Sequence, residues 1–333
     1  MTISHSTVES THQAPQSNVA YSIVGVDVAK RKLDLYVLDK KQSLSISYKP
    51  DEIARVLTSL TSESQTPLLV VMEATGGLEQ PLLDQLVAAN IACAVLNPAR
   101  VRQFARGCGF LEKSDKIDAQ IIANHAHLKM PRLHVPPDKS TQQLAELCSY
   151  RERMMAMLLQ EKNRLQFINC PNLRVIIEKH CEYMRKQIRK LNGEIAKLIK
   201  SNEKNSKKAD VLRSVPGVGP VSSATIIARL PEIGTINRQK IAKLVGVAPI
   251  VKESGTKRGQ RKISGGRRDV RRVLYMAALT AIKRNPTIKA MYQRLCDKGK
   301  TKKSAIVACM RKLLIILNCM VRDDQPWKAT LTS

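Results

Sequence analysis

Short apolar runs alternate with helical patterns through the first 130 residues of this chain. Strand-like runs occupy residues 21–28, 33–38, 43–48, 68–72 and 91–96, and helical periodicity occupies residues 51–63, 78–90 and 114–130. Three strands followed by helix, strand, helix, strand and a further helix give the order of a ribonuclease H-like domain. The pattern therefore predicts an α/β domain with a mixed sheet over residues 20–135.

Four acidic residues occupy notable positions in this pattern, two of them in or at the end of apolar strands and two at the start of a helix. Asp27 interrupts the apolar run SIVGVDVA, and Glu73 ends the run LLVVME just before the reversal at residues 75–77. A carboxylate in a buried strand is costly unless a cation or a donor compensates it. Asp115 and Asp118 are three residues apart, so a helix starting there places both on one face, where they repel each other without a cation.

Together these four acids predict one metal site. Oxygen-only ligands suit Mg²⁺ or Mn²⁺, and two such ions ~4 Å apart stabilise the attacking and leaving oxygens of a phosphodiester displacement. Each acid also has a structural alternative: Asp27 can meet Lys30, Glu73 can cap a loop, and Asp118 can be a solvated helix residue. Their joint order along the chain favours metal-assisted chemistry on nucleic acid.

Positive charge is concentrated in the second part of the chain. The net charge is +28, but residues 1–140 hold 15 Lys and Arg against 14 Asp and Glu, which leaves +27 on residues 141–333. A field of this strength recruits a polyanion. Nucleic acid is favoured over a membrane, because the sequence has no evident amphipathic anchor or lipidation signal.

The compartment and the chain ends give weaker signals. Residues 1–19 lack Lys, Arg and an apolar core, which predicts a disordered leader and not a targeting peptide. The late apolar stretch AIVACMRKLLIILNCMV is interrupted by Arg311 and Lys312, which predicts a packed helix and not a membrane span. Eight scattered cysteines without a C-x-x-C pair fit free thiols in a reducing cytoplasm.

Prolines at 131, 136 and 137 predict a boundary, beyond which residues 141–205 read as a helical linker. A long helix over 141–169 is broken at residues 170–172 before a second helix over 173–201. The second helix carries a heptad seam of Ile177, Cys181, Met184, Ile188, Leu191, Ile195 and Leu198. The alternatives are an intramolecular hairpin and a coiled coil between chains. A short, highly charged hairpin has little else to bury this seam against, so the pattern favours a homodimer.

Residues 206–325 predict a mostly helical third domain that begins with a helix-hairpin-helix. The segment VLRSVPGVGPVSSATIIARL places Gly217 and Gly219 between two helical patterns. Glycines there let backbone N–H groups approach a phosphate, and the N-terminus of the second helix adds its dipole. A helical turn without a ligand is the structural alternative.

A basic, glycine-rich segment follows at residues 252–272. KESGTKRGQRKISGGRRDVRR holds nine Lys and Arg against two acids, and it lies between the apolar segments GVAPIV and VLYMAALTAI. It therefore reads as a loop of a folded domain, not as a solvated tail. The predicted nucleic-acid contacts are Lys257, Arg258, Arg261, Lys262, Arg267, Arg268, Arg271 and Arg272. Aromatic residues make up only 3% of the chain, which argues against base stacking as the main mode of recognition.

In their order and spacing, the motifs GVDVAK, MEATGG, KSDKIDA, SVPGVGPVSSATIIA, GVAP and SGTKRGQRKISGGRRDVRRVLYMAA resemble the DEDD transposases of the insertion sequence one-ten family and the related Piv-type DNA invertases. The resemblance runs from about residue 21 to 320. It implies a RuvC-like domain whose acids bind Mg²⁺, a coiled-coil linker, and a transposase domain with a catalytic serine. Asp27, Glu73, Asp115 and Asp118 match the acids.

The serine of the family matches Ser254 in SGTKRG, with Ser264 as the reserve candidate. The resemblance implies that Ser254 attacks a DNA phosphodiester and forms a phosphoserine link, which a second strand end resolves. The metal and the nearby Arg258, Arg261 and Lys262 would activate the serine and stabilise the leaving oxygen. Taken by itself, a serine in a basic loop is more often a phosphate contact. Tyr275 is a further conceivable nucleophile, although its apolar helix favours packing.

The resemblance also implies the partners. A structured bridge RNA pairs with donor and target DNA and so supplies sequence choice, and the active enzyme is a cytoplasmic homotetramer with sites composed from different subunits. Three alternatives to the guided transposase are a Piv-like site-specific invertase, a metal-only nuclease of the Holliday-junction type, and a non-catalytic nucleic-acid-binding protein. The last leaves four converging carboxylates unexplained.

Overall fold

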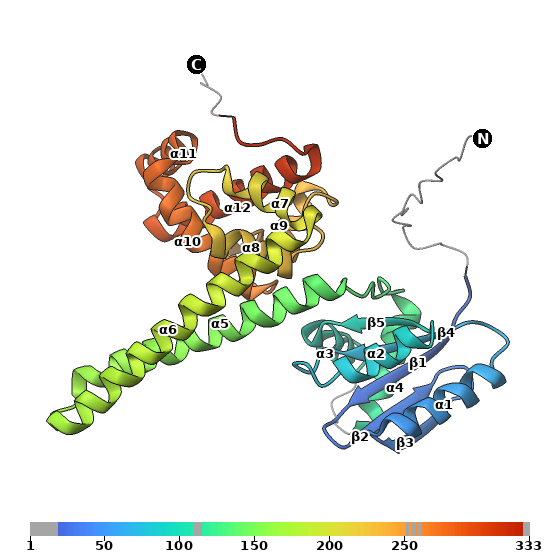
Figure 1. Cartoon of the computed structure of the whole chain (residues 1–333). Helices are drawn as coiled ribbons and strands as arrows, with labels where there is room; N and C mark the ends of the chain where they lie inside the picture. Colours follow the sequence, from blue (N-terminus) through green and yellow to red (C-terminus); the bar gives the residue numbers. More distant parts are fainter. Residues whose placement is uncertain (1–18, 110–114, 251–252, 255–256, 259–261, 329–333) are drawn as a thin grey trace, which may run out of the picture. The chain divides into compact units, whose positions relative to one another are not determined.

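The computed structural model describes residues 19–109, 115–250, 253–254, 257–258 and 262–328. The chain divides into two compact units, Met1–Pro136 and Pro137–Ser333. The division falls between the two adjacent prolines. Figure 1 shows the elements of the first unit in blue to teal and those of the second unit in green to red.

The first unit is built on a five-stranded mixed sheet of order β3-β2-β1-β4-β5. Its strands are β1 (Ser22–Val28), β2 (Lys32–Val37), β3 (Gln42–Ser47), β4 (Leu68–Glu73) and β5 (Ala92–Leu96). β1, β2 and β3 pair antiparallel, whereas β4 is parallel to both β1 and β5. This order and these directions are those of a ribonuclease H-like sheet, which confirms the predicted α/β domain.

Helices cover both faces of this sheet because alternate strand residues point to opposite sides. On one face, Val24 and Val26 of β1 join the core formed with α1 (Pro50–Glu63) and α2 (Gln80–Ala88). On the other face, Ile23 joins the core formed with α3 (Pro98–Gly107) and α4 (Asp115–Leu128). The odd-numbered residues of β1 and β4 therefore face α4.

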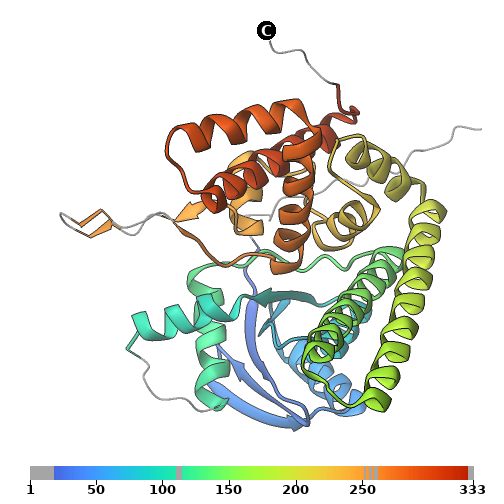
Figure 2. The same cartoon turned by 90° about the vertical axis from the view of Figure 1, so that its left-hand side faces the viewer.

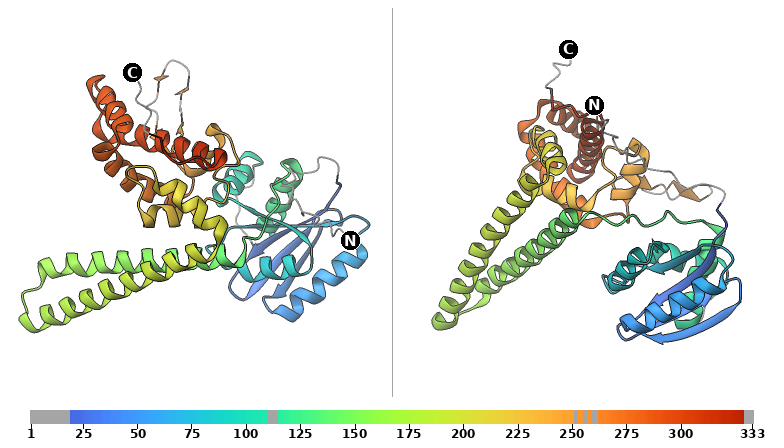
Figure 3. Two further views of the ribbon diagram at one scale, coloured as in Figure 1. Left: turned by 45° about the horizontal axis from the view of Figure 1, so that its top comes forward. Right: turned by 45° about the vertical axis from the view of Figure 1, so that its right-hand side comes forward.

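The second unit begins with a helical hairpin. α5 (Lys139–Arg164) and a 3₁₀ turn, η1 (Leu165–Phe167), lead into α6 (Pro171–Ser201), and the two long helices lie side by side in both views of Figure 3. Asp138 caps α5 by accepting the N–H of Thr141 at 2.9 Å. The distal part of the hairpin has its own core, made of Met154 and Leu158 of α5 with Ile177, Cys181, Met184 and Ile188 of α6.

This packing changes the argument about the heptad seam of the second helix. The seam is buried within the chain by α5, so the intramolecular hairpin, which the sequence analysis disfavoured, is what the structure contains. The expectation that this seam has no partner within the chain was wrong, because Met154 and Leu158 of α5 pack against it. A coiled coil between two chains stays a prediction, and it would have to form through a surface of α6 other than this seam.

The helices that follow α6, other than α11, contribute to the largest apolar core among the described residues. The helices after α6 are α7 (Glu203–Arg213), α8 (Pro220–Arg229), α9 (Arg238–Val245), α10 (Arg268–Arg284), α11 (Pro286–Asp297) and α12 (Lys302–Asp323). Figure 2 shows α10, α11 and α12 in orange to red, packed against one another. Two pairs of two-residue strands interrupt the helices: β6 (Pro249–Ile250) with β9 (Lys262–Ile263), and β7 (Glu253–Ser254) with β8 (Lys257–Arg258).

α12 contributes buried residues to this core. Among the described residues it is the one helix whose length and composition would suit a membrane span. Its apolar residues Leu313, Leu314 and Leu317 are fully buried inside the protein core. The side-chain amide of Asn318 donates to the Ile236 carbonyl at 2.9 Å, and its oxygen accepts the Gly234 N–H at 2.9 Å. The stretch is the packed helix that its sequence predicts.

Candidate active site

Two of the predicted acids are neighbours on one face of the sheet. In the parallel pairing of β1 and β4, Val26 lies opposite Met72, so the next residues, Asp27 and Glu73, lie side by side at the ends of the two strands. Both are odd-numbered and share the face that α4 covers. Both are half-buried. Adjacent strands are about 4.8 Å apart, which brings two carboxylates within reach of one cation.

The turn after Glu73 is held by the side chain of Glu79. One carboxylate oxygen accepts the backbone N–H groups of Thr75 at 3.1 Å and Gly77 at 2.8 Å, and also the Thr75 hydroxyl at 3.0 Å. Burial works to raise the pKa of Glu79, but these hydrogen bonds together lower it below its usual value. Gly76 and Gly77 supply the left-handed backbone of this reversal, with φ of 76° and 112°. The turn therefore has a fixed shape beside the site.

The third acid comes from α4, which lies against the same sheet face. Asp118 is half-buried and precedes Ile122 by one turn, and Ile122 is 1% exposed against the sheet. Residues four apart share a helix face, so Asp118 is on the sheet-facing side of α4. Asp115 is the first residue of the same helix, one turn before the buried Ala119. Its side chain lies outside the described part of the chain.

The donor set has the chemistry that a hard divalent cation requires. Asp27, Glu73 and Asp118 offer oxygen ligands only, from three elements that meet on one face. Within the described residues, which do not include the side chain of Asp115, no group of three or more His, Cys, Asp or Glu side chains lies close enough together to hold a metal ion. The donor set thus fits Mg²⁺ or Mn²⁺ in kind, and the arrangement of the ligands around an ion remains a proposal.

The two candidate serines lie in the basic segment of the second unit. Ser254 pairs with Lys257 across the β7–β8 ladder, so it occupies a hairpin within the loop. The side chains of Ser254, Lys257 and Arg258, and all of Arg261, lie outside the described residues. Ser264 is exposed and is followed by Gly265 and Gly266, whose φ values are 67° and 71°.

Several of the predicted nucleic-acid contacts already have partners within the protein. Arg267 makes a two-pronged ion pair with Glu232, at 2.5 and 2.6 Å, and also donates to the Arg229 carbonyl at 2.8 Å. Arg271 donates to the carbonyls of Val245 and Gly265. These two arginines hold the base of the loop, which leaves them fewer donors for a phosphate.

The other basic residues of the segment are more accessible. Lys262, Arg268 and Arg272 are exposed, and among the described residues the ionic contacts of Arg272 to Glu152 and Asp269 are long, each 3.7 Å. Exposed cations on a structured loop are the groups that phosphate binding needs.

The two glycines of the predicted helix-hairpin-helix differ in role. A Cβ at Gly217 would lie 2.7 Å from the Ala281 amide of α10, and its φ is 113°, so this glycine is required for packing. Gly219 precedes α8 as its N-cap, and a Cβ there would meet no heavy atom of the described structure within 4 Å. Gly219 is therefore the one of the two that a ligand can approach.

Comparison with known families places the chain. Residues 24–168 match the DEDD transposase model of the IS110 group, described as a transposase, and residues 209–293 match the transposase model of the IS116/IS110/IS902 family. These two matches together span more than half of the chain. The chain belongs to the IS110 transposase family. Its enzyme class is that of a DNA transposase or recombinase.

Individual relatives extend this result. The pilin gene-inverting protein of Moraxella lacunata is 24% identical over 91% of this IS110-family chain and 97% of its own length. The insertion element IS110 43.6 kDa protein of Streptomyces coelicolor is 29% identical over 42% of this chain and 34% of its own length. Among solved structures, Thermus thermophilus RuvC in complex with a Holliday junction covers 34% of this chain and 99% of its own, at 18% identity and a TM-score of 0.25.

The structure adds a glycine that the motif GVDVAK of this IS110-family transposase contains but that the sequence analysis did not consider. A Cβ at Gly25 would overlap the carbonyl oxygen of Ala119 and would lie 2.7 Å from the amide nitrogen of Ala123. Gly25 thus lets the backbone of α4 lie directly on β1, two residues from Asp27. The signal was a glycine inside a strand, which often marks close approach by another backbone.

A fifth acid also escaped the sequence analysis. Asp34 of β2 is directly opposite Asp27 in the antiparallel pair and is 3% exposed. Residues opposite each other in such a pair share a sheet face. Lys32 Nζ lies 3.0 Å from Asp34 Oδ2. The sequence does contain a sign of this residue, because the acid in the apolar run KLDLYV, like Asp27, is a carboxylate within a strand that reads as buried.

Proposed function

We propose that this IS110-family enzyme cuts and rejoins donor and target DNA through a phosphoserine intermediate at Ser254, assisted by a divalent metal held by Asp27, Glu73, Asp115 and Asp118. The observation that carries the proposal is the convergence of Asp27, Glu73 and α4 on one sheet face, with α4 in backbone contact at Gly25. Carboxylates collected in this way have a clear use in phosphoryl transfer, where negative charge builds on the reacting oxygens.

In the proposed reaction, Ser254 Oγ attacks the phosphorus of a DNA phosphodiester. The serine–phosphorus bond forms while the bond to one sugar oxygen breaks, the hydroxyl proton passes to a base, and the departing sugar oxygen is protonated. A hydroxyl end of a second strand then attacks the phosphoserine and restores Ser254. Mg²⁺ or Mn²⁺, when bound, would stabilise charge on the attacking and leaving oxygens.

The residues of the basic segment would position the DNA for this attack. Arg258, Arg261 and Lys262 are close to Ser254 in sequence, and Lys262, Arg268 and Arg272 are exposed. Ser264 is the reserve nucleophile, because it is exposed beside two glycines with left-handed backbone. Gly219 at the start of α8 offers a further approach to a phosphate.

Sequence choice is proposed to come from a structured bridge RNA. The +27 net charge of residues 141–333 supports binding of more than one nucleic acid strand, and few aromatic side chains are present for base readout. The active form is proposed to be a homotetramer in the bacterial cytoplasm, associated with the nucleoid when bound to DNA.

A site-specific DNA invertase is the second candidate function. It is favoured by the match to the Moraxella pilin gene-inverting protein, which covers 97% of that protein and 91% of this chain. Transposition and inversion would use the same strand-exchange chemistry and would differ in how the recombining DNA sites are arranged. A metal-only junction nuclease is a third possibility, which would require the acids and not Ser254.

Denaturing gel analysis of the protein with Mg²⁺, the RNA transcribed beside its gene, and labelled donor and target DNA tests the proposal. We expect a protease-sensitive protein–DNA adduct with wild type and with Ser264→Ala, and no adduct with Ser254→Ala. Equal cutting by wild type and Ser254→Ala without an adduct would identify a metal-only nuclease. Recombination that is unaffected by omitting the RNA, on substrates with inverted sites, would favour the invertase.

A further inference from the structure

Asp34 continues the line of acids across the sheet of the first unit. It pairs with Asp27 in the antiparallel ladder of β1 and β2, and Asp27 in turn lies beside Glu73 at the ends of β1 and β4. Tyr36, two residues after Asp34 on β2, belongs to the core that α4 forms on one face of the sheet, so Asp34 shares that face. Three neighbouring strands therefore carry one carboxylate each, in a row across the face that α4 covers.

The side chain of Asp34 is more deeply buried than that of Asp27. Asp34 is 3% exposed, whereas Asp27 is half-buried. Lys32 Nζ lies 3.0 Å from Asp34 Oδ2, and the side chain of this lysine is 46% exposed. No hydrogen bond to Asp34 Oδ2 is formed within the described part of the chain. The chain thus keeps a carboxylate in its interior at a cost to folding, with a lysine at the surface as its ionic partner.

The position of Asp34 couples its charge to that of Asp27. Two carboxylates directly opposite each other in an antiparallel pair repel, and a cation beside them relieves the repulsion. Asp34 and Glu73 are two strands apart, which is about 10 Å between their backbones. Among the described residues no three acids lie close enough together to hold an ion. Asp34 can therefore act on an ion at Asp27 and Glu73 through its charge, without being a ligand.

We propose that Asp34 is a fifth acid of the metal site, a positioning residue that strengthens cation binding by Asp27 and Glu73 without contacting the ion. This inference rests on the metal site proposed above. The charge of Asp34 attracts the ion across the β1–β2 pair, and its repulsion of the Asp27 carboxylate favours rotamers that turn toward Glu73. Lys32 has the opposite effect on affinity, because its ammonium group lies beside the row and repels an incoming cation.

The affinity of the full-length protein for Mn²⁺, measured by electron paramagnetic resonance without DNA, tests the role of Asp34. We expect Asp34→Asn to weaken Mn²⁺ binding by about tenfold and Lys32→Met to strengthen it by about threefold. The double variant Lys32→Met/Asp34→Asn is expected to bind Mn²⁺ with an affinity between those of the single variants. Opposite signs separate an effect of charge from structural damage, which would weaken binding in both single variants.

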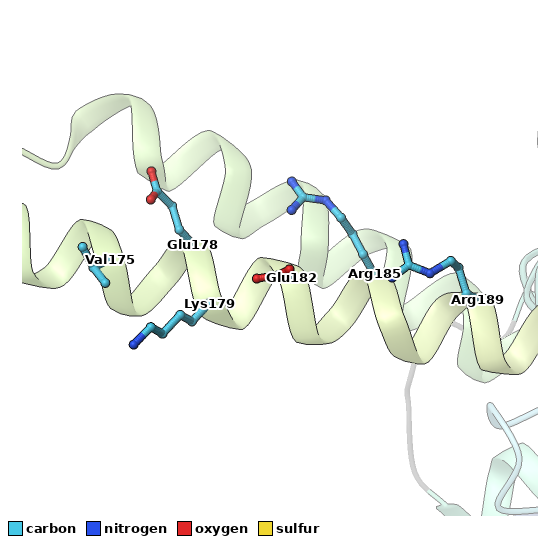
Figure 4. A pocket seen from close by; sticks show the side chains of 6 residues that line it. All are labelled: Val175, Glu178, Lys179, Glu182, Arg185 and Arg189. Carbon is cyan, nitrogen blue, oxygen red and sulfur yellow. The ribbon is translucent and has the colours of Figure 1, made fainter.

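Glu182→Gln and Lys179→Met are the matched controls, because they remove the same charges from exposed residues that line a groove on α6 in the second unit (Figure 4). Both are expected to bind Mn²⁺ like wild type. Thermal unfolding without metal shows whether each variant is folded. If Asp34→Asn does not fold, Lys32→Met still decides, because an affinity equal to wild type would overturn the proposal.

The outcomes distinguish this proposal from the metal site on which it rests. Wild-type affinity in Asp34→Asn and Lys32→Met, together with lost affinity in Asp27→Asn, would overturn the role of Asp34 and leave the metal site standing. Weaker binding in both Asp34→Asn and Lys32→Met would overturn it too, because their ion pair would then only support the fold. Absence of Mn²⁺ binding by wild type would overturn the metal site as well.

Discussion

The carboxylate face of the first unit and the basic segment of the second unit present functional groups in opposite ways. Asp27, Glu73 and Asp118 lie on two strands and a helix whose positions are fixed by register and by the contact at Gly25. The basic residues lie on and around two-residue strands, and Arg267 and Arg271 bind the protein itself. The acids that are costly to bury are therefore held in defined positions, whereas part of the abundant positive charge is used by the protein itself.

The sharpest way to test the first half of this comparison is Asp27→Asn. Removing one charge from the carboxylate face is expected to lower strand cleavage by about a thousandfold or more, because several kcal/mol of charge stabilisation in the transition state are lost. Folding stability is expected to stay equal or to rise, since the substitution relieves repulsion with Asp34. Cleavage assays and thermal unfolding check both results. Asp51→Asn, at an exposed position of α1, is the control.

Gly25→Ala should disturb the same face through packing. The added methyl group must displace α4, which is expected to cost about 1–3 kcal/mol of unfolding free energy and to lower cleavage as Asp118 moves. Gly107→Ala is the matched control, because a Cβ there meets no described heavy atom within 4 Å. Equal stability of the two variants in urea unfolding would show that α4 does not depend on this contact.

Arg267→Ala and Arg268→Ala distinguish arginines that stabilise the protein from arginines that are free to bind nucleic acid. Loss of the half-buried Arg267 removes its two-pronged ion pair with Glu232 and is expected to destabilise the second unit by about 1.5–3 kcal/mol. Loss of the exposed Arg268 should leave stability unchanged and reduce the slope of nucleic-acid affinity against salt by about one. Denaturation and salt-dependent binding measure the two effects. If both variants behave alike, the comparison between structural and accessible arginines fails.

Glu79→Gln tests the smaller, pH-dependent contribution of the turn beside Glu73. The pKa of Glu79 is lowered in the folded protein, so its contribution is fully present above the unfolded value of about 4.3 and is lost as the pH falls through the lowered folded pKa. Wild type is expected to be about 1 kcal/mol more stable than the variant at neutral pH. The difference should vanish in acid, as followed by thermal unfolding between pH 7 and pH 3. A difference that grows in acid would contradict the assignment.

Much of the first unit could be predicted because its elements have strong periodicity. The run at residues 21–28 corresponds to Ser22–Val28, and the helical pattern at 51–63 corresponds to Pro50–Glu63. α3 (Pro98–Gly107) was missed because its sequence PARVRQFARG buries only Val101 fully and so has little apolar pattern.

Other features depended on contacts that no local pattern encodes. The short strands β6 to β9 are too brief for any period to appear. The partner of the α6 seam was misjudged because the apolar residues of α5 that cover it, Met154 and Leu158, are spaced among exposed methionines and leucines. At the candidate site, residue type and strand position predicted the four acids, and their role stays a prediction. Gly25 and Asp34 could be found only from the strand register and the position of α4.

Binding of Mn²⁺ by the purified protein, followed by electron paramagnetic resonance without DNA, tests the central claim most directly. The account predicts that wild type binds the ion and that Asp27→Asn and Glu73→Gln each lose most of that affinity, whereas Asp51→Asn keeps it. Binding by Asp27→Asn and Glu73→Gln that equals wild type would show that these carboxylates do not form a metal site.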